Sequence, residues 1–317
     1  MPAASSLPLA SRAAPPFAAQ LFRLEAPRRD DFDLIRLAGR GAYAEVWQVR
    51  HRPTGALLAL KQLRTDREDQ RAALRIFENE AEVAGRVSSD FVVRLVHPQL
   101  DADPPYLILE WLTGRTLEAR LASGRRLFCR EALWIARQCA QGIHALLVAG
   151  YVHGDIKPSN IFLADDGAAK LIDLGFARPD RLPATDLANA FERHVTGTPE
   201  YLAPETLLAG DSSGVGRDIY SLGVTIYRML TGALPFTGGS VGEVLRQHQG
   251  SVPHRLRALA PDVPREVDEL VQRLLSKQPL RRGAGLSWLI RELIGLELAQ
   301  LAADAEGPVH GVKPVRN

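Results

Sequence analysis

The segment His153–Asn160 (HGDIKPSN) carries the strongest chemical signal in the sequence. The carboxylate of Asp155 can accept a proton from an attacking hydroxyl group, and the ammonium of Lys157 can neutralise a transferring phosphoryl group. The side-chain oxygen of Asn160 is of the kind that binds divalent metal ions. The spacing H-x-D-x-K-x-x-N arises by chance in roughly a few per thousand chains of this length. The segment therefore predicts a phosphoryl-transfer centre.

A second carboxylate follows thirteen residues after Asn160, in the sequence Asp173-Leu174-Gly175. A carboxylate at the end of a strand and before a glycine turn is suited to bind Mg²⁺. A D-x-G sequence on its own is more often an ordinary turn. Its place after Asn160 is what makes Asp173 a candidate metal ligand.

Glycines also mark an earlier turn, Gly39–Val46 (GRGAYAEV), between two predicted strands. Glycine lets backbone N–H groups approach phosphate oxygens because it has no Cβ. Ala44 stands where a third glycine would complete the pattern, and most glycine turns between strands are only hairpins. The turn is a weak signal by itself.

Lys61 ends an apolar strand that follows this turn. It is either an ordinary edge lysine or a phosphate-binding ammonium held by a carboxylate on the next helix. Glu80 is the best candidate partner because it shares a helix face with Ala84; Glu78 and Glu82 remain alternatives. The 39 basic residues comprise 34 Arg and only five Lys, so a retained lysine indicates a position that needs a compact ammonium.

The elements that must position these residues change in type along the chain. Strands are predicted near 32–37, 46–49, 57–60, 92–93 and 106–109, with one helix over 67–87. Beyond Thr113 helices predominate, over 130–149, 217–231, 240–248, 264–276 and 285–303, with short strands at 161–163 and 169–172 and an irregular segment over 173–205. A small sheet-rich half followed by a larger helical half predicts an α+β fold.

Composition excludes several classes of protein. Of the 317 residues, 46% are hydrophobic and 24% are charged, which is typical of globular proteins. The net charge of +2 gives no reason to expect nucleic-acid binding. Two cysteines, Cys129 and Cys139, form no disulfide framework, and the longest apolar stretch is too short to span a membrane. We therefore expect a cytoplasmic protein without a membrane span.

The ends of the chain differ from its middle. Residues 1–30 are rich in Ala, Pro and Arg and predict a disordered extension, with an organellar transit peptide as the alternative. A folded domain is expected over 31–298, followed by a flexible tail over 304–317.

Two further segments follow the motifs described above: Gly197–Glu205 (GTPEYLAPE) and Asp218–Gly223 (DIYSLG). In this order, over about residues 31–295, the segments resemble a eukaryotic-type (Hanks-type) serine/threonine protein kinase of the bacterial kind. HGD replaces the usual HRD, and DLG replaces DFG. The resemblance implies a two-lobed fold: an N-lobe over 31–110 with a small antiparallel sheet and one long helix, and a mainly helical C-lobe over 113–298.

The resemblance also implies roles for individual residues. Asp155 would be the catalytic base and Lys157 the phosphate contact, with Asn160 and Asp173 holding Mg²⁺, or Mn²⁺ as the alternative. The implied ATP-binding residues are Ala38, Gly39, Gly41, Val46, Ala59, Lys61, Glu80, Leu109, Glu110, Leu112 and Phe162. Two structural roles are implied as well. Glu205 would pair with a late arginine, for which Arg282 is the candidate, and Asp218 would brace the catalytic loop.

The implied activity is transfer of the γ-phosphoryl group of ATP to Ser or Thr hydroxyls of protein substrates. Lys157 and Thr198 favour Ser/Thr over Tyr, because in this family they lie beside the acceptor hydroxyl. Two alternatives remain: a catalytically inactive pseudokinase, and a small-molecule phosphotransferase of the aminoglycoside or choline kinase type, which shares the H-G-D sequence.

Gly154 replaces an arginine that usually engages a phosphorylated activation segment. We therefore expect activity to depend only weakly on phosphorylation there. Thr185 and Thr196 are the candidate autophosphorylation sites, because Thr198 is expected to have a structural role.

Overall fold

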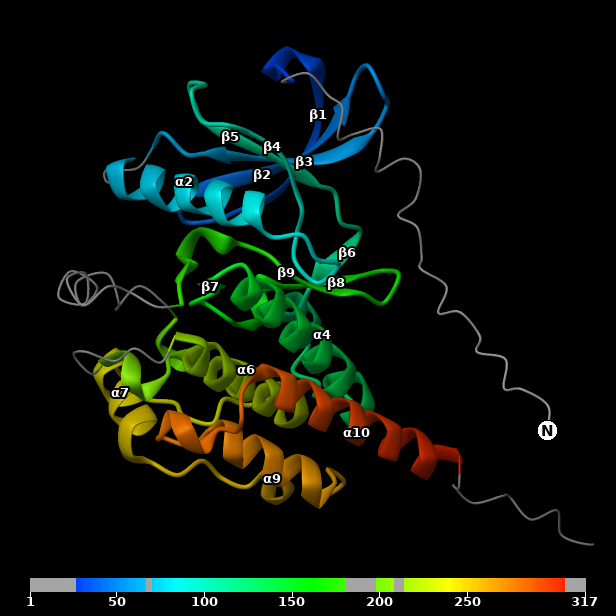
Figure 1. Cartoon of the computed structure of the whole chain (residues 1–317), viewed down its shortest axis with the longest axis vertical. Helices are drawn as coiled ribbons and strands as arrows, with labels where there is room; N and C mark the ends of the chain where they lie inside the picture. The colour runs from blue at the N-terminus through cyan, green and yellow to red at the C-terminus, as the bar shows by residue number, and fades with distance from the viewer. Residues whose placement is uncertain (1–26, 67–69, 181–197, 208–213, 306–317) are drawn as a thin grey trace, which may run out of the picture. The chain divides into compact units, whose positions relative to one another are not determined.

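The computed structural model describes residues 27–66, 70–180, 198–207 and 214–305 (Figure 1). Its contacts divide the chain into two compact units. The sheet unit comprises the described residues within Met1–Arg67 and Leu95–Trp111, and the helical unit those within Glu68–Arg94 and Leu112–Asn317. The expected autophosphorylation sites Thr185 and Thr196 lie outside the described residues, as do most of the expected terminal extensions.

The sheet unit is built on one five-stranded antiparallel sheet with the strand order β1-β2-β3-β5-β4. Its strands are β1 (Phe32–Arg40), β2 (Ala44–His51), β3 (Leu57–Leu63), β4 (Leu95–Gln99) and β5 (Tyr106–Glu110). A short 3₁₀ turn, η1 (Arg29–Asp31), precedes β1, and the carbonyl of Pro27 accepts a hydrogen bond from the Tyr106 hydroxyl (3.3 Å).

The two faces of this sheet differ in chemistry because successive side chains of a strand point to opposite sides. One face carries the apolar core of the unit, which includes Val49, Leu58, Leu60, Tyr106 and Ile108. The strand register pairs Val46 with Lys61 and Ala59 with Leu109. Each of these residues is an odd number of positions from the core residues of its own strand, so its side chain points to the other face of the sheet. The opposite face therefore presents four of the expected ATP-binding residues together.

One predicted strand was wrong. Val92 and Val93 were expected to form a strand, but the strand β4 begins at Leu95. Val92 instead makes an isolated parallel bridge with Leu171, and the Val93 N–H donates to the Leu171 carbonyl (2.9 Å). Two adjacent valines favour extended backbone but do not determine which neighbour they pair with.

The long helix α2 (Gln70–Arg86) forms because its apolar residues recur on one face. That face includes Ala73, Phe77, Ala81 and Ala84, all buried, together with Glu80. The contacts assign α2 to the helical unit, where it packs on the short turn η3 (Leu174–Phe176).

The helical unit is organised around α6 (Gly214–Thr231), which is buried along most of its length. The helix α4 (Cys129–Val148) packs against α6, and α10 (Leu286–Ala305) runs alongside α4 (Figure 1). The Arg137 guanidinium joins α4 to α10 through Glu297 (2.8 and 3.1 Å). The remaining helices are α3 (Leu117–Leu121), α7 (Val241–Gly250), α8 (Leu256–Leu259) and α9 (Arg265–Leu274).

Small sheets place two loops of this unit side by side. The strands β6 (Gly114–Thr116), β8 (Ile161–Ala164) and β9 (Ala169–Leu171) form one sheet. The pair β7 (Tyr151–Val152) and β10 (Arg178–Pro179) forms another. Because β8 pairs with β9 and β7 with β10, the loop 153–160 and the loop 172–177 leave paired strands together.

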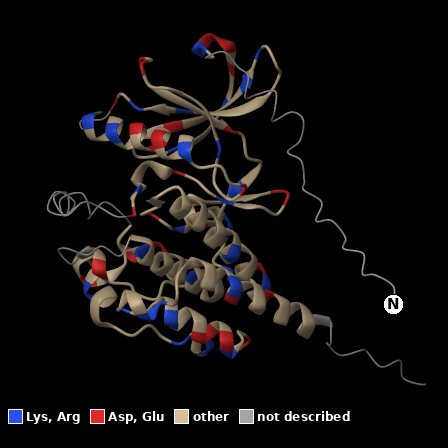
Figure 2. Cartoon of the chain, in the orientation of Figure 1, with Lys and Arg blue, Asp and Glu red and all other residues tan. Residues whose placement is uncertain are grey.

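The predicted α+β fold class is confirmed by the antiparallel sheet unit and the mainly helical unit. No helix among the described residues is long and apolar enough to cross a membrane. Along α2 the charges are grouped: Arg71 and Arg75 come first, the glutamates follow in the middle of the helix, and Arg86 ends it (Figure 2).

Candidate active site

The loop 153–160 brings together the three residues that the sequence singled out. The Asn160 side-chain nitrogen donates to the Asp155 carboxylate (2.8 Å to Oδ2) and to the Asp155 carbonyl (2.9 Å). The Lys157 ammonium lies 2.7 Å from the same Oδ2 atom. Both of these side-chain contacts are made to Oδ2 rather than to Oδ1.

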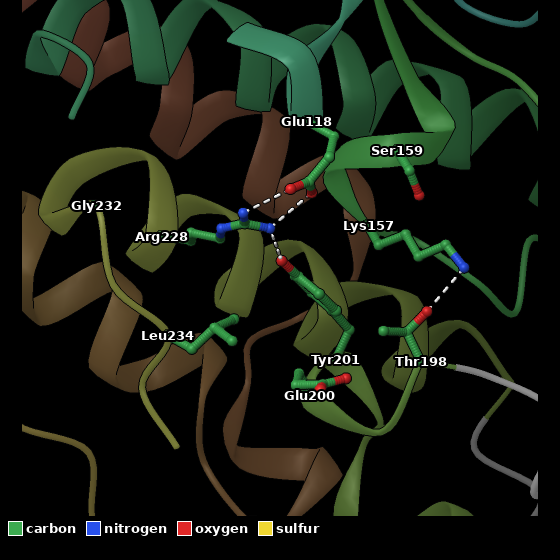
Figure 3. A pocket seen from close by; sticks show the side chains of 9 residues that line it. All are labelled: Glu118, Lys157, Ser159, Thr198, Glu200, Tyr201, Arg228, Gly232 and Leu234. Atoms are coloured by element: carbon green, nitrogen blue, oxygen red, sulfur yellow. Dashed lines mark hydrogen bonds and ion pairs between the residues drawn. The ribbon is translucent and has the colours of Figure 1, made fainter. Parts of the chain in front are cut away.

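Lys157 also reaches a residue far along the chain. Its ammonium donates to the Thr198 hydroxyl (2.8 Å), as Figure 3 shows. One cation therefore links the Asp155 carboxylate to Thr198.

Asp218 braces the loop from α6, as predicted. Its carboxylate accepts from the His153 N–H (2.7 Å) and the Gly154 N–H (2.9 Å). Burial raises the pKa of the Asp218 carboxyl, and His153 and these two N–H groups oppose that rise. The backbone of the loop is thus held by a buried acceptor.

His153 connects this loop to the residue before Asp173. Its Nδ1 atom accepts from the Asp155 N–H (3.3 Å), so the ring carries its proton on Nε2, which donates to the Ile172 carbonyl (3.3 Å). The Ile172 N–H donates in turn to the Asn160 carbonyl (2.9 Å). These bonds fix the spacing between the two loops.

Gly154 has a left-handed backbone (φ +77°), and a Cβ placed there would lie 2.8 Å from the Phe176 carbonyl oxygen. The loop 153–160 therefore approaches the loop 172–177 so closely at Gly154 that a larger residue such as arginine would not fit without a shift of the backbone.

Asp173 is the one non-glycine residue with positive φ (+64°) in the described part of the chain. Asp173 offers a carboxylate, and Asn160, whose nitrogen is engaged by Asp155, offers its remaining amide oxygen. Oxygen donors of this kind fit Mg²⁺ or Mn²⁺. Among the described residues, no group of three or more His, Cys, Asp or Glu side chains is arranged to hold a metal ion by itself.

A cavity of about 490 Å³ opens beside Lys157 and Thr198 (Figure 3). Across it, the Arg228 guanidinium donates to both carboxylate oxygens of Glu118 (2.7 Å each) and to the Tyr201 hydroxyl (2.7 Å). Burial raises the pKa of Tyr201 to about 12. The remaining lining residues are Ser159, Glu200, Gly232 and Leu234.

Glu118, Tyr201 and Arg228 line the cavity, although no pattern in the sequence predicted them as lining residues. The available signal was an arginine within the apolar run TIYRML of α6. Its carboxylate partner lies 110 residues earlier in the chain, so no local spacing reveals the pair.

The glycine turn forms the hairpin between β1 and β2. The Gly41 N–H donates to the Ala44 carbonyl (2.8 Å) across the turn. Arg64 holds this hairpin twice: its N–H donates to the Tyr43 carbonyl (2.9 Å) and its guanidinium to the Gly41 carbonyl (2.9 Å). Asp66 accepts two bonds from Arg64 (2.9 and 2.7 Å), and that contact lowers the pKa of Asp66 to about 2.

The other expected ATP-binding residues lie in both units. In the sheet unit, Ala38 is exposed at the end of β1, Ala59 and Leu109 are buried, and Lys61 is half-buried. Glu110 ends β5, and the division between the units falls between Trp111 and Leu112. In the helical unit, Phe162 is a half-buried residue of β8.

Burial distinguishes the three glutamates of α2. Glu80 is buried, whereas Glu78 and Glu82 are exposed, and Glu82 accepts from the Tyr151 hydroxyl (3.1 Å). Glu80 is thus the best placed of the three for an internal role, and its pairing with Lys61 stays a prediction.

The predicted pair of Glu205 and Arg282 is confirmed. Arg282 makes two bonds to the Glu205 carboxylate, one of them 2.6 Å long, and both side chains are buried.

Comparison with known proteins agrees with this arrangement. A family model described as "Protein kinase domain" matches residues 32–292. The chain is 32% identical over 278 residues to serine/threonine-protein kinase MRCK gamma of Homo sapiens, covering 86% of this chain and 18% of that protein. It is 34% identical over 258 residues to serine/threonine-protein kinase pkn2 of Myxococcus xanthus, covering 79% and 30%. It is 32% identical over 279 residues to Pkn1 of the same organism, covering 86% and 39%. The chain therefore spans less than half the length of each of these relatives.

Proposed function

The chain belongs to the protein kinase family, and we propose that it transfers the γ-phosphoryl group of ATP to serine and threonine hydroxyls of protein substrates. One observation carries this proposal: the Lys157 ammonium and the Asn160 amide nitrogen both contact the same oxygen, Oδ2, of the Asp155 carboxylate. In the proposal, the same carboxylate accepts the proton of the substrate hydroxyl.

In the proposed reaction, Asp155 accepts the proton of the Ser or Thr hydroxyl that attacks the γ-phosphorus of ATP. The Lys157 ammonium offsets negative charge on the phosphoryl group during transfer. General-base catalysis of this kind contributes roughly 10²- to 10⁴-fold. Positioning and charge neutralisation supply most of the remainder, since phosphoryl transfer requires little covalent chemistry from the protein.

Members of the family use ATP and a divalent metal ion. For this chain we assign the metal to Asn160 and Asp173, with Mg²⁺ preferred and Mn²⁺ as the alternative. The ion would neutralise charge on the phosphate oxygens. We assign the nucleotide to the glycine turn and Lys61 of the sheet unit, together with the other residues expected above.

The preference for Ser and Thr is supported by the bond between Lys157 and Thr198. Both residues line the cavity, and the same ammonium contacts the proposed base. The printed names of the three relatives point to the same specificity.

The decisive experiment incubates the protein with labelled ATP and Mg²⁺ in the presence of a panel of Ser/Thr proteins, with a panel of aminoglycosides and choline in parallel. Label on proteins that is lost in Asp155→Asn supports the proposal. Label on small molecules alone would favour the second class of kinase, and binding of ATP without transfer would favour a pseudokinase.

Two further assignments belong to this proposal. The free thiols Cys129 and Cys139 support a cytoplasmic location. Autophosphorylation is assigned to Thr185 or Thr196, and phosphopeptide mapping after incubation with ATP tests it.

A further inference from the structure

Asn79, the residue before Glu80 on α2, binds the turn that follows Asp173. Its side-chain nitrogen donates to the Ala177 carbonyl (2.7 Å) and the Gly175 carbonyl (3.0 Å), and it lies 3.5 Å from the Leu174 carbonyl. An amide nitrogen carries two hydrogens, so it can satisfy the two nearer carbonyls fully. One side chain thus holds the backbone on both sides of residue 176.

Close packing accompanies these bonds. A Cβ placed on Gly175 would lie 2.5 Å from the Ile76 side chain of α2, so the helix and the turn approach each other at a distance that only glycine allows. The Leu174 side chain within the turn is fully buried. The turn therefore has little freedom to shift along the helix.

Asp173 directly precedes this turn and has the left-handed backbone described above. A non-glycine residue in that conformation costs of the order of 1 kcal/mol or more, and it persists only where its surroundings hold it. On one side of Asp173, Ile172 is bonded to Asn160 and His153; on the other side, the carbonyls are bonded to Asn79.

We propose that Asn79 is a positioning residue for the metal site: it holds the turn 174–177 and thereby keeps Asp173 in the left-handed conformation that presents its carboxylate. The proposal rests on the metal role given to Asp173 under the proposed function.

The test compares Asn79→Asp and Asn79→Ala with Glu78→Gln, a matched change at an exposed neighbouring position on the same helix. An aspartate of nearly the same shape cannot donate and brings negative charge towards the carbonyls. Two readouts are needed: amide hydrogen exchange of peptides covering 174–177 in the nucleotide-free and metal-free protein, and the Mg²⁺ concentration that gives half-maximal activity.

In both Asn79 variants, we expect the backbone amide hydrogens of the turn 174–177 to exchange at least about tenfold faster than in the wild type, because two hydrogen bonds to the turn are lost. We expect their half-maximal Mg²⁺ concentration to rise by about tenfold, with the KM for the protein substrate unchanged. Glu78→Gln should resemble the wild type in both readouts.

An unchanged exchange rate in a folded Asn79 variant would overturn the proposal. Faster exchange with an unchanged Mg²⁺ requirement would also overturn it, because the hydrogen bonds from Asn79 would then serve only to hold the turn. Should Asn79→Asp not fold, Asn79→Ala gives the same two readouts. The exchange measurement needs no activity. If the metal role of Asp173 is wrong, Asp173→Ala will keep full activity in Mg²⁺, which separates that failure from a failure of the inference about Asn79.

Discussion

Lys157 and Thr198 are joined by a hydrogen bond of 2.8 Å between the lysine ammonium and the threonine hydroxyl, across 41 residues of chain. The same ammonium lies 2.7 Å from Asp155. The position of Thr198 therefore bears directly on the environment of the proposed base, and a change at residue 198 should affect protein substrates more than ATP.

Thr198→Val removes the hydroxyl and keeps the shape of the side chain. We expect kcat/KM for a protein substrate to fall by about tenfold, because a bond to a charged donor is lost. The KM for ATP should change little. Steady-state kinetics with each substrate varied in turn measure both values, and Thr198→Ser should retain activity. Equal losses for ATP and protein substrate would contradict the assignment.

Asp155→Asn should keep the contacts to Lys157 and Asn160, because an amide oxygen still accepts hydrogen bonds. It removes the proton acceptor, so kcat should fall by roughly 10²- to 10⁴-fold. ATP affinity, measured by calorimetry, should stay close to that of the wild type. A large loss of ATP affinity with normal turnover would show that Asp155 has a different role.

Lys61→Arg tests whether Lys61 binds a phosphate. This chain uses arginine at 34 of its 39 basic positions, so an ordinary surface lysine should tolerate the change. A planar guanidinium does not replace a compact ammonium in a site shaped for it. We expect a severe loss of activity and an unchanged melting temperature. Near-normal activity would count against the nucleotide assignment in the sheet unit.

Arg64→Met should loosen the glycine turn, because Arg64 donates to the Gly41 carbonyl and is itself held by Asp66. Loss of one such bond predicts a rise of about three- to tenfold in the KM for ATP, with a smaller effect on kcat. The matched control is Arg52→Met, which removes an exposed arginine bonded to Asp33 (2.7 Å) in the same unit. The idea fails if both variants raise the KM equally.

His248 makes stability depend on pH. The buried ring contacts Tyr220 through a 2.8 Å hydrogen bond, and burial with the nearby Lys277 lowers the pKa of His248 from 6.5 to about 4. Between these two values the unfolded chain binds more protons than the folded protein, so stability falls as the pH drops from 6.5 towards 4. The loss should reach up to about 3 kcal/mol. Urea unfolding at pH 7 and pH 4.5 measures it, and His248→Asn should lose less stability over the same range.

Local sequence determined much of the fold. The helices α4 and α6 were predicted to within three residues at each end, because apolar positions at helical spacing are a property of the segment itself. The strand at Val92 was misplaced, because its pairing with Leu171 depends on residues far along the chain. The helices α3 and α8 are too short to show a period.

The candidate site follows the same rule. Asp155, Lys157 and Asn160 were found because they share one short segment, and their mutual bonds could be expected from it. The bond between Arg228 and Glu118, the left-handed backbone of Asp173 and the donation by Asn79 arise from tertiary contacts between distant segments. No spacing in the sequence contains that information.

The buried pair of Glu205 and Arg282 bears on how far the chain can be shortened. Removing one partner of a buried ion pair typically costs about 3–5 kcal/mol, because the other charge is left without compensation. A truncation before residue 282 would leave the buried Glu205 carboxylate without the Arg282 guanidinium. The bond from Arg137 to Glu297 extends the same requirement into α10. The smallest autonomously folding form of this protein should therefore end beyond residue 297, and proteolytic trimming from the C-terminus should stop near that point.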